Sequence, residues 1–195
     1  MREKIIAQKI SAKYSQLSSK SIDELASILE RKQINKHKLV LREKETLSSL
    51  YYVDQGLLRM FCLKKGHDMT DNFISEDNIC VDVSGFLKKV PTGLMIETLE
   101  ASVLYEIPYL SLMDLAEYNS ELSSLYRIII ERALMESYQK WDVFRFATAK
   151  ERYVRFMKDF PSIVIRVPLL YIASYLAMSP ETLSRVRGAI FSSNK

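Results

Sequence analysis

The sequence has few of the residues that build metal centres. Only two cysteines, Cys62 and Cys80, and two histidines, His37 and His67, occur among 195 residues, and the cysteines do not form a CxxC pair. This set holds too few ligands for a zinc or iron–sulfur site. We therefore expect two reduced, mostly buried thiols, no metal, and histidines that lie in charged surface loops.

Catalytic motifs and long apolar runs are missing as well. The two histidines and scattered acids form no Ser/His/Asp set, phosphate-binding loop or paired-carboxylate motif. We therefore expect no catalytic residues and a protein that is not an enzyme. No apolar run approaches the ~20 residues needed to span a bilayer, and residues 1–16 carry charges every few positions, unlike a secretory signal. These absences predict a cytoplasmic protein with no membrane partner.

What the chain does have is a local excess of positive charge. Residues 148–195 hold eight basic and three acidic side chains, a net charge of +5, whereas residues 1–147 carry −1. Positive charge gathered in one segment suits a phosphate backbone. The charge distribution therefore favours a nucleic acid as the partner of the C-terminal segment.

Two short amphipathic segments follow each other in residues 168–191. Apolar or small residues recur there at helical spacing. Ser179 offers a hydroxyl N-cap, Pro180 suits the first helical position, and Glu181 stands where the helix dipole favours a carboxylate. This order predicts a helix-turn-helix, whose second helix can enter a DNA major groove; an ordinary αα-hairpin is the alternative. Ala177 takes the turn position usually held by glycine, at a cost of about 1 kcal/mol.

The rest of the chain divides into a β-rich part and a helical part. From about Val40 to Pro108, short runs of β-branched and aromatic residues alternate with turn signals, which indicates an antiparallel sandwich or jelly roll. Residues 21–30 precede it as a short amphipathic helix, with Ser21 as N-cap and Glu24 completing a capping box. Residues 121–147 contain neither glycine nor proline and predict one long helix, followed by a further helix from Thr148 to Lys158.

The long helix carries two apolar stripes. The first consists of Leu122, Leu125, Ile129 and Ala133, and the second of Tyr126, Ile130, Leu134, Tyr138 and Trp141. A helix with two apolar stripes needs two partners, and these are its own β-domain and a second copy of the same helix. We therefore expect a homodimer and assign the dimer contact to the first stripe. Burial of both stripes within one chain is the alternative.

The order of a small β-domain, a long helix and a C-terminal helix-turn-helix resembles the cyclic-AMP receptor protein/Fnr family of bacterial transcription regulators. The resemblance covers nearly the whole chain. Its most specific segments are LYYVDQGLLRMF (50–61), AKERYVRFMKDFP (149–161) and VPLLYIASYLAMSPETLSRVR (167–187).

The resemblance implies an α+β fold in three parts. These are an N-terminal, cyclic-nucleotide-binding-like β jelly roll for an effector over residues 1–118, a long dimerisation helix over 119–147 and a helix-turn-helix DNA-binding domain over 148–195. The expected partners are double-stranded DNA with an inverted-repeat site, a second copy of the chain, and RNA polymerase as a further candidate. A small-molecule sensor with weak or vestigial DNA binding is the alternative function.

The resemblance also implies which residues contact DNA. The base-reading positions carry over to Glu181 and Arg185, whose side chains can read the edges of cytosine and guanine. Spaced i, i+4, they could instead form only a surface ion pair. Further contacts to phosphates or bases are expected from Ser179, Thr182, Ser184 and Arg187.

One feature of the family's cyclic-nucleotide binders is missing. Those proteins place a glutamate on the ribose and, further along the chain, an arginine on the cyclic phosphate. Here Asp82 stands near the glutamate position, while Thr92 and Gly93 fall where the arginine is expected. A buried phosphate without a fixed cation loses its main compensation for desolvation. We therefore expect an effector pocket at Asp82 and Thr92 that does not take cyclic AMP; an unknown small molecule could bind there, and no cofactor is identified.

Overall fold

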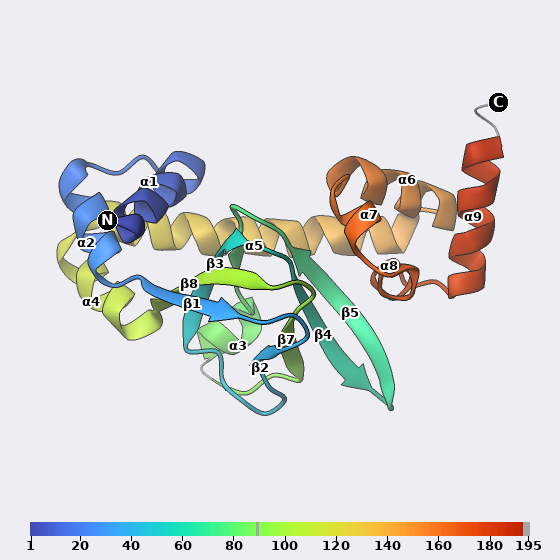
Figure 1. Ribbon diagram of the computed structural model, residues 1–195, viewed down its shortest axis with the longest axis horizontal. Coiled ribbons are helices and arrows are strands. Elements are labelled where there is room, and N and C mark those ends of the chain that lie inside the picture. Colours follow the sequence, from blue (N-terminus) through green and yellow to red (C-terminus); the bar gives the residue numbers. More distant parts are fainter. Residues whose placement is uncertain (89, 193–195) are drawn as a thin grey trace.

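The computed structural model describes residues 1–88 and 90–192, except for the side chain of Phe191. Helix α5 (Ser120–Phe146) runs along the molecule (Figure 1). Helices α1 (Arg2–Tyr14) and α2 (Ser19–Ser27) lie beside its first half, the strands lie below it, and the C-terminal helices gather at its far end. The α+β architecture predicted from the sequence is confirmed.

The β-domain consists of two four-stranded antiparallel sheets within the described residues. The strand orders are β1-β8-β3-β6 and β2-β7-β4-β5. Tyr52 pairs with Tyr105 in the first sheet, and Met60 pairs with Ile96 in the second. The strands are β1 (Glu30–Ile34), β2 (Leu39–Leu41), β3 (Ser49–Gln55), β4 (Leu58–Lys64), β5 (His67–Ile74), β6 (Ile79–Cys80), β7 (Leu94–Thr98) and β8 (Ser102–Pro108).

The sandwich and the N-terminal helices share one apolar core, here called the first core. Helices α3 (Val83–Lys88) and α4 (Tyr109–Tyr118) each contribute a buried side chain to it, Phe86 and Leu112. Burial of this many aliphatic and aromatic side chains is the main favourable term in folding the β-domain. Its buried residues include Ile6, Ile10, Leu25, Leu50, Tyr52, Ile96, Leu104, Ile107, Leu122, Leu125 and Ile129.

The first apolar stripe of α5 is buried in this core and does not face a second copy, contrary to our expectation. Leu122, Leu125 and Ile129 are almost fully buried, and Ala133 is half-buried against the same cluster. The physical reason is α1, which the sequence reading did not include as a helix. Its buried Ile6 and Ile10 belong to the same cluster, and α1 and α2 both contact α5. The chain therefore covers this stripe itself.

The N-cap of helix α2 lies three residues before the predicted one. Ser18, and not Ser21, is the N-cap, because the Ser18 hydroxyl accepts a hydrogen bond from the Ser21 backbone amide at 3.3 Å. The side chains of Ser21 and Glu24 instead accept hydrogen bonds from the Asn119 amide, at 2.8 and 2.6 Å. Asn119 in turn caps α5 by accepting from the backbone amides of its first turn. The predicted capping pair thus anchors the start of the long helix.

The C-terminal helices form a second core. They are α6 (Ala149–Asp159), α7 (Ile163–Arg166), α8 (Leu169–Tyr175) and α9 (Pro180–Ser192). The second core consists of Tyr153, Phe156, Ile163, Val167, Ile172, Ala173, Leu176 and Leu183 together with Leu57, Phe73 and Leu99 of the β-domain. It therefore crosses the domain boundary that we placed after residue 147. Residues 193–195 of the proposed third domain lie outside the described part.

The described residues contain no group of three or more histidine, cysteine or acidic side chains that could hold a metal ion. Cys62 is half-buried and Cys80 is buried, and desolvation raises the pKa of the Cys80 thiol to about 12. His37 lies in a turn and His67 begins β5, both exposed. None of the described helices combines the length and the apolarity that crossing a membrane requires.

Candidate nucleic-acid interface

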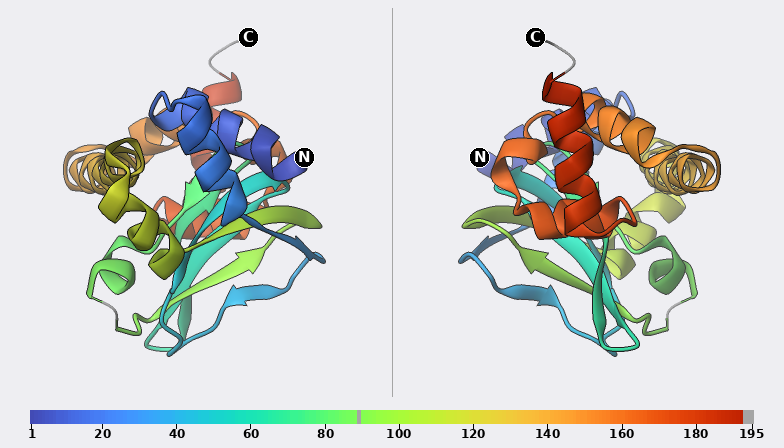
Figure 2. Two further views of the ribbon diagram at one scale, coloured as in Figure 1. Left: turned by 90° about the vertical axis from the view of Figure 1, so that its left-hand side faces the viewer. Right: turned by 90° about the vertical axis from the view of Figure 1, so that its right-hand side faces the viewer.

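Helix α9 lies on the end face of the molecule. It stands at the far end of α5, with α6, α7 and α8 behind it (Figure 2). Its inner side reaches the second core through Leu183, which is fully buried, while Val186 and Ile190 are partly buried against the same cluster. The opposite side of the helix is therefore free to meet a flat or grooved partner.

The turn between α8 and α9 has the backbone that a helix-turn-helix requires. Ala177 adopts a φ of 51°, in the left-handed region that usually favours glycine. The backbone amide of Met178 closes the turn by donating to the carbonyl oxygen of Ala173 at 3.0 Å. Ala173 is 1% exposed, which fits the small residue expected where the two helices meet.

Arg152 stabilises this turn from α6. Its Nη1 donates to the carbonyl oxygens of Leu176 at 2.6 Å and Ala177 at 3.4 Å. Carbonyls at the end of a helix lack partners within the helix, so a cation placed there satisfies them and interacts favourably with the helix dipole. We did not predict this role, because nothing in the local sequence links Arg152 to a turn in the next pair of helices.

The start of α9 is capped as predicted. The Ser179 hydroxyl accepts a hydrogen bond from the backbone amide of Thr182 at 3.2 Å. Hydrogen bonds from the Ser179 side chain and from its own backbone lower the pKa of Glu181. A carboxylate held charged at this position can accept hydrogen bonds from a base edge or from water.

Four of the six predicted DNA contacts are exposed, namely Ser179, Glu181, Ser184 and Arg185, while Thr182 and Arg187 are half-buried. The structure pairs Arg185 with Thr182, through Nη2 and Oγ1 at 3.5 Å. Over the described ranges 1–88 and 90–192, no ion pair joins Glu181 to Arg185. The surface-pair alternative is therefore not what the structure shows, and both charges point to solvent.

Part of the positive charge of the C-terminal segment is neutralised within the chain. Arg155 pairs with Asp159 at 3.3 Å, and Arg166 pairs with two glutamates of the β-domain. Lys150, Lys158 and Arg185 remain exposed, and Lys195 lies outside the described residues. Fewer cations are therefore free to contact phosphates than the net charge of the segment alone indicates.

Comparison with known proteins finds similar transcription regulators. No family model matches the chain. It is 25% identical over 182 residues to the transcriptional activator protein FnrA of Stutzerimonas stutzeri, which covers 87% of this chain and 74% of FnrA. It is 23% identical over 189 residues to the anaerobic regulatory protein of Pasteurella multocida, covering 89% and 68%. The structure of FixK2 from Bradyrhizobium japonicum superposes with a TM-score of 0.75 at 17% identity, covering 86% of each chain.

The chain is similar in sequence to these two regulators of transcription, and its fold is that of solved Crp/Fnr regulators. The two relatives are named as regulators and not as enzymes. Within this Crp/Fnr fold, the helix-turn-helix is the part whose geometry best supports a function.

The two residues that we predicted for a Crp/Fnr effector pocket lie together, but they bind each other. Asp82 is 4% exposed, and its Oδ2 accepts a short hydrogen bond from Thr92 Oγ1. Its Oδ1 accepts from the backbone amide of Gly85 at 3.2 Å. A Cβ at Gly85 would lie 2.6 Å from Asp82 Oδ2, so glycine is required there for steric reasons. One carboxylate oxygen thus holds the start of α3, and the other holds Thr92.

A buried arginine connects this Crp/Fnr β-domain to the helix-turn-helix. Arg59 is 1% exposed and donates to Thr70 Oγ1 and Glu97 Oε1, both at 2.8 Å. Its guanidinium carbon lies 3.8 Å from the ring centroid of Tyr171 on α8, a cation–π geometry. The backbone amide of Thr70 also donates to Ser174 Oγ at 2.9 Å. We missed this contact, although an arginine inside the apolar run LLRMFC was a usable signal.

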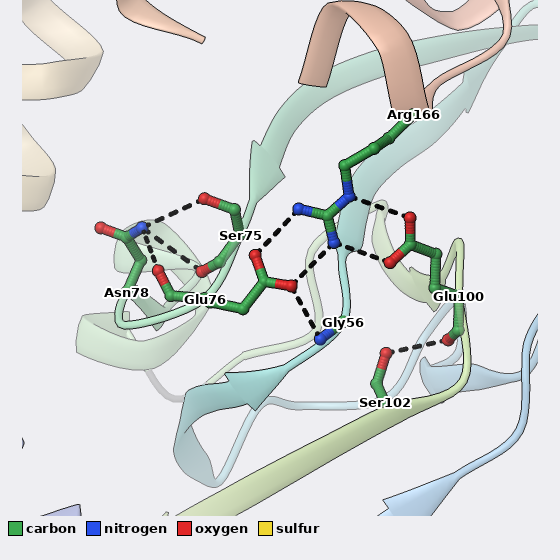
Figure 3. Close-up of polar contacts among 7 residues, drawn as sticks. All are labelled: Gly56, Ser75, Glu76, Asn78, Glu100, Ser102 and Arg166. Atoms are coloured by element: carbon green, nitrogen blue, oxygen red, sulfur yellow. Dashed lines mark hydrogen bonds and ion pairs between the residues drawn. The ribbon is translucent and has the colours of Figure 1, made fainter. Parts of the chain in front are cut away.

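Arg166 makes a second connection, and Figure 3 shows it reaching from α7 between two turns of the β-domain. Its Nε and Nη2 donate to Glu100 at 2.9 and 2.6 Å, and its Nη1 and Nη2 donate to Glu76 at 2.9 and 2.8 Å. The guanidinium holds the pKa of both carboxyls below their usual value, and the carboxylates raise the pKa of Arg166. No pattern in the sequence pointed to this cluster.

Proposed function

We propose that this protein is a transcription regulator that binds double-stranded DNA as a homodimer and reads an inverted repeat with α9. The observation that carries the proposal is the exposed face of α9, where Glu181, Ser184 and Arg185 point to solvent from a capped helix-turn-helix on the end of the molecule. A chain that works on chromosomal DNA is expected to act in the cytoplasm.

Base reading is tested by substituting Arg185. A bidentate arginine contributes about 1–3 kcal/mol of discrimination between bases, so Arg185→Ala should weaken binding to a selected site by roughly 5- to 150-fold and binding to random DNA far less. Lys158→Ala is the matched control, because an exposed lysine on α6 should affect both DNAs equally or not at all. Gel-shift or anisotropy titrations at fixed salt measure both. Equal losses on the two DNAs for Arg185→Ala would refute base reading.

Dimerisation is supported by the second stripe of α5. Leu134, Tyr138 and Trp141 are 49%, 70% and 67% exposed and follow one another at helical spacing. Met135 beside them is 55% exposed. Large apolar side chains in one contiguous row on a soluble helix mark an interaction surface, and a parallel second copy offers the complementary row. Tyr126 and Ile130, at the start of this stripe, pack in the first core, so the dimer contact is proposed for its exposed later part in place of the first stripe.

The dimer is tested with the double substitution Tyr138→Ser/Trp141→Ser. We expect it to convert the protein to a monomer, because it removes two large apolar contacts from each copy. Leu110→Ser on α4 is the control, since Leu110 is also 70% exposed but lies away from the stripe. Sedimentation velocity across a concentration series separates the outcomes. A double variant that still dimerises as the unsubstituted protein does would refute this interface.

The effector site is expected not to take cyclic AMP. A cyclic phosphate placed near Thr92 would have to displace the Thr92–Asp82 hydrogen bond and would meet the Asp82 carboxylate without a fixed cation. Calorimetric titration with cyclic AMP should show no binding in the micromolar range, and saturable micromolar binding would overturn this point. Binding of another small molecule at this site and contact with RNA polymerase stay predictions.

The alternative is a small-molecule sensor whose DNA contacts are vestigial. It predicts no salt-sensitive binding to any fragment in a genomic library, whereas a DNA-binding regulator must lose affinity as salt rises, because binding releases counterions. The exposed charges of α9 favour the regulator.

A further inference from the structure

Arg166 is placed to control how the helix-turn-helix sits on the β-domain. It is the last residue of α7, and only Val167 and Pro168 separate it from α8. Val167 is 7% exposed and lies in the second core, and its backbone amide donates to Ile163 at 3.1 Å. Pro168 has a fixed φ. A displacement of Arg166 would therefore pass to α8 and, through the second core, to α9.

The glutamates that Arg166 binds stand on rigid turns. The backbone amide of Gly56 donates to Glu76 Oε1 at 3.1 Å, and the Asn78 side-chain amide donates to the Glu76 carbonyl at 3.0 Å. Ser102 Oγ donates to the Glu100 carbonyl at 2.9 Å (Figure 3). The backbones of both glutamates, and the carboxylate of Glu76, are thus held by contacts other than those with Arg166.

Gly56 ties these two turns together. Its φ is 99°, and a Cβ there would lie 2.2 Å from Ser102 Oγ. The turn that carries the Glu76 hydrogen bond is therefore in close steric contact with the turn that carries Glu100. Gly56 thus links the two glutamate-bearing turns, by its hydrogen bond to Glu76 and by its close contact with Ser102.

The contact between the Arg166 guanidinium and the two carboxylates fixes the orientation of the arginine as well as attracting it. A guanidinium is planar and presents its donors in a rigid fork, so four hydrogen bonds to two carboxylates fix its rotation as well as its position. Lysine offers the same charge without this planar fork. Without the cation, Glu76 and Glu100 would face each other as like charges.

We propose that Arg166 is a positioning residue that fixes the orientation of α8 and α9 on the β-domain and thereby sets the half-site spacing that the dimer accepts. This inference rests on the proposed function. Adding one base pair between half-sites moves one of them by about 3.4 Å and turns it by about 34°, since a helical turn spans about 34 Å and 10–10.5 base pairs. A dimer with rigidly mounted reading helices discriminates against such a site, and a dimer with loosely mounted helices does not.

The experiment measures spacing discrimination. A site selected from random DNA with the unsubstituted full-length protein is compared with the same site lengthened by one base pair, and with a single half-site. The variants are Arg166→Met, Arg166→Lys, and Glu76→Gln/Glu100→Gln, which removes the partners without touching the DNA-binding segment. Arg155→Met is the matched control, because it removes one arginine from an exposed pair with Asp159 in the same segment.

We expect the affinity ratio between the selected and the lengthened site to fall about tenfold in Arg166→Met and in the double glutamine variant, which corresponds to about 1.4 kcal/mol. Single half-site affinity should stay within about twofold of its value in the Arg155→Met control, because α9 itself is unchanged. Arg166→Lys should recover only part of the ratio, and Arg155→Met should retain it. Sedimentation of each variant confirms that it is a folded dimer.

Two results would overturn the inference. One is an unchanged ratio in both the Arg166→Met and the double glutamine variants. The other is an equal loss of affinity on the half-site and on both full sites, which indicates a merely structural role. Failure of the proposed function itself can be distinguished from these results. In that case the unsubstituted protein selects no DNA site that it binds with salt-dependent affinity.

Discussion

The two cores of this protein hold their parts together in different ways. The first core gathers aliphatic and aromatic residues from α1, α2, both sheets and the first half of α5. The second core is smaller, and among its described buried residues Leu57, Phe73 and Leu99 come from the β-domain. Directional contacts supplement it, namely those of Arg59, Arg152 and Arg166. Burial of apolar side chains thus stabilises the β-domain. The position of the DNA-binding helices on the β-domain depends also on a few polar contacts, which can be removed one at a time.

The largest effect should come from opening the first core. Leu125→Ala removes a side chain that is 1% exposed and should lower the free energy of unfolding by about 2–5 kcal/mol. Leu134→Ala makes the same change further along α5, where the side chain is 49% exposed, and should cost about 0.5 kcal/mol or less. Urea unfolding in the Tyr138→Ser/Trp141→Ser background removes the dimer contribution. Similar losses at the two positions would contradict the burial pattern of α5.

Acid should weaken the attachment of the second core. The pKa values of Glu76 and Glu100 lie below their usual value of 4.5 in the folded protein, so the Arg166 contact stabilises the fold above that pH and is lost as pH falls through the lowered values. The unfolding free energies of the unsubstituted protein and Arg166→Met should differ by about 1 kcal/mol at pH 6, a figure that allows for solvent screening. The difference should shrink below pH 4.5, and a difference independent of pH down to 3 would contradict this account.

A helix cap in the C-terminal part should have a moderate effect. Thr148 and Glu151 form a capping box at the start of α6, so Thr148→Ala should destabilise the protein by about 1 kcal/mol. Thr148→Ser keeps the hydroxyl and should be nearly neutral. Thermal unfolding followed by circular dichroism measures both, and equal shifts for the two variants would show that the hydroxyl does not act as the cap.

The smallest effect should be a gain in stability. Ala177→Gly relieves the left-handed backbone but increases the freedom of the unfolded chain, for a net stabilisation of about 0.5 kcal/mol. Ala12→Gly, on the exposed side of α1, makes the same change in ordinary helical backbone and should destabilise by about 0.5–1 kcal/mol. Changes of opposite sign in the unfolding free energies of the two variants would support strain at Ala177, and changes of the same sign would argue against it.

The elements of the fold could be predicted because their signals are local. The absence of glycine and proline from 121–147 matches α5, and the helix predicted from Thr148 to Lys158 matches α6, whose N-cap is Thr148. Alternation and turn residues identified the antiparallel sheets. The Ser179 cap and the left-handed turn at Ala177 followed from the chemistry of single positions.

The partners of each surface could not be predicted, because they depend on contacts between distant segments. The first stripe of α5 was assigned to a second copy, since the helix that covers it, α1, has only a weak apolar pattern among its charges. Net charge likewise counted Arg166 toward DNA, although its partners, Glu76 and Glu100, lie far away in sequence. Which cations are free and which are used internally is a property of the three-dimensional arrangement.

The exposure of Trp141 has a practical consequence. It is the single tryptophan of the chain and lies 67% exposed on the second half of α5. Its indole emission therefore reports on one defined spot, and burial of that spot in an apolar contact should move the emission to shorter wavelength. The protein carries its own optical probe of self-association, so that dilution series can be read without any attached dye.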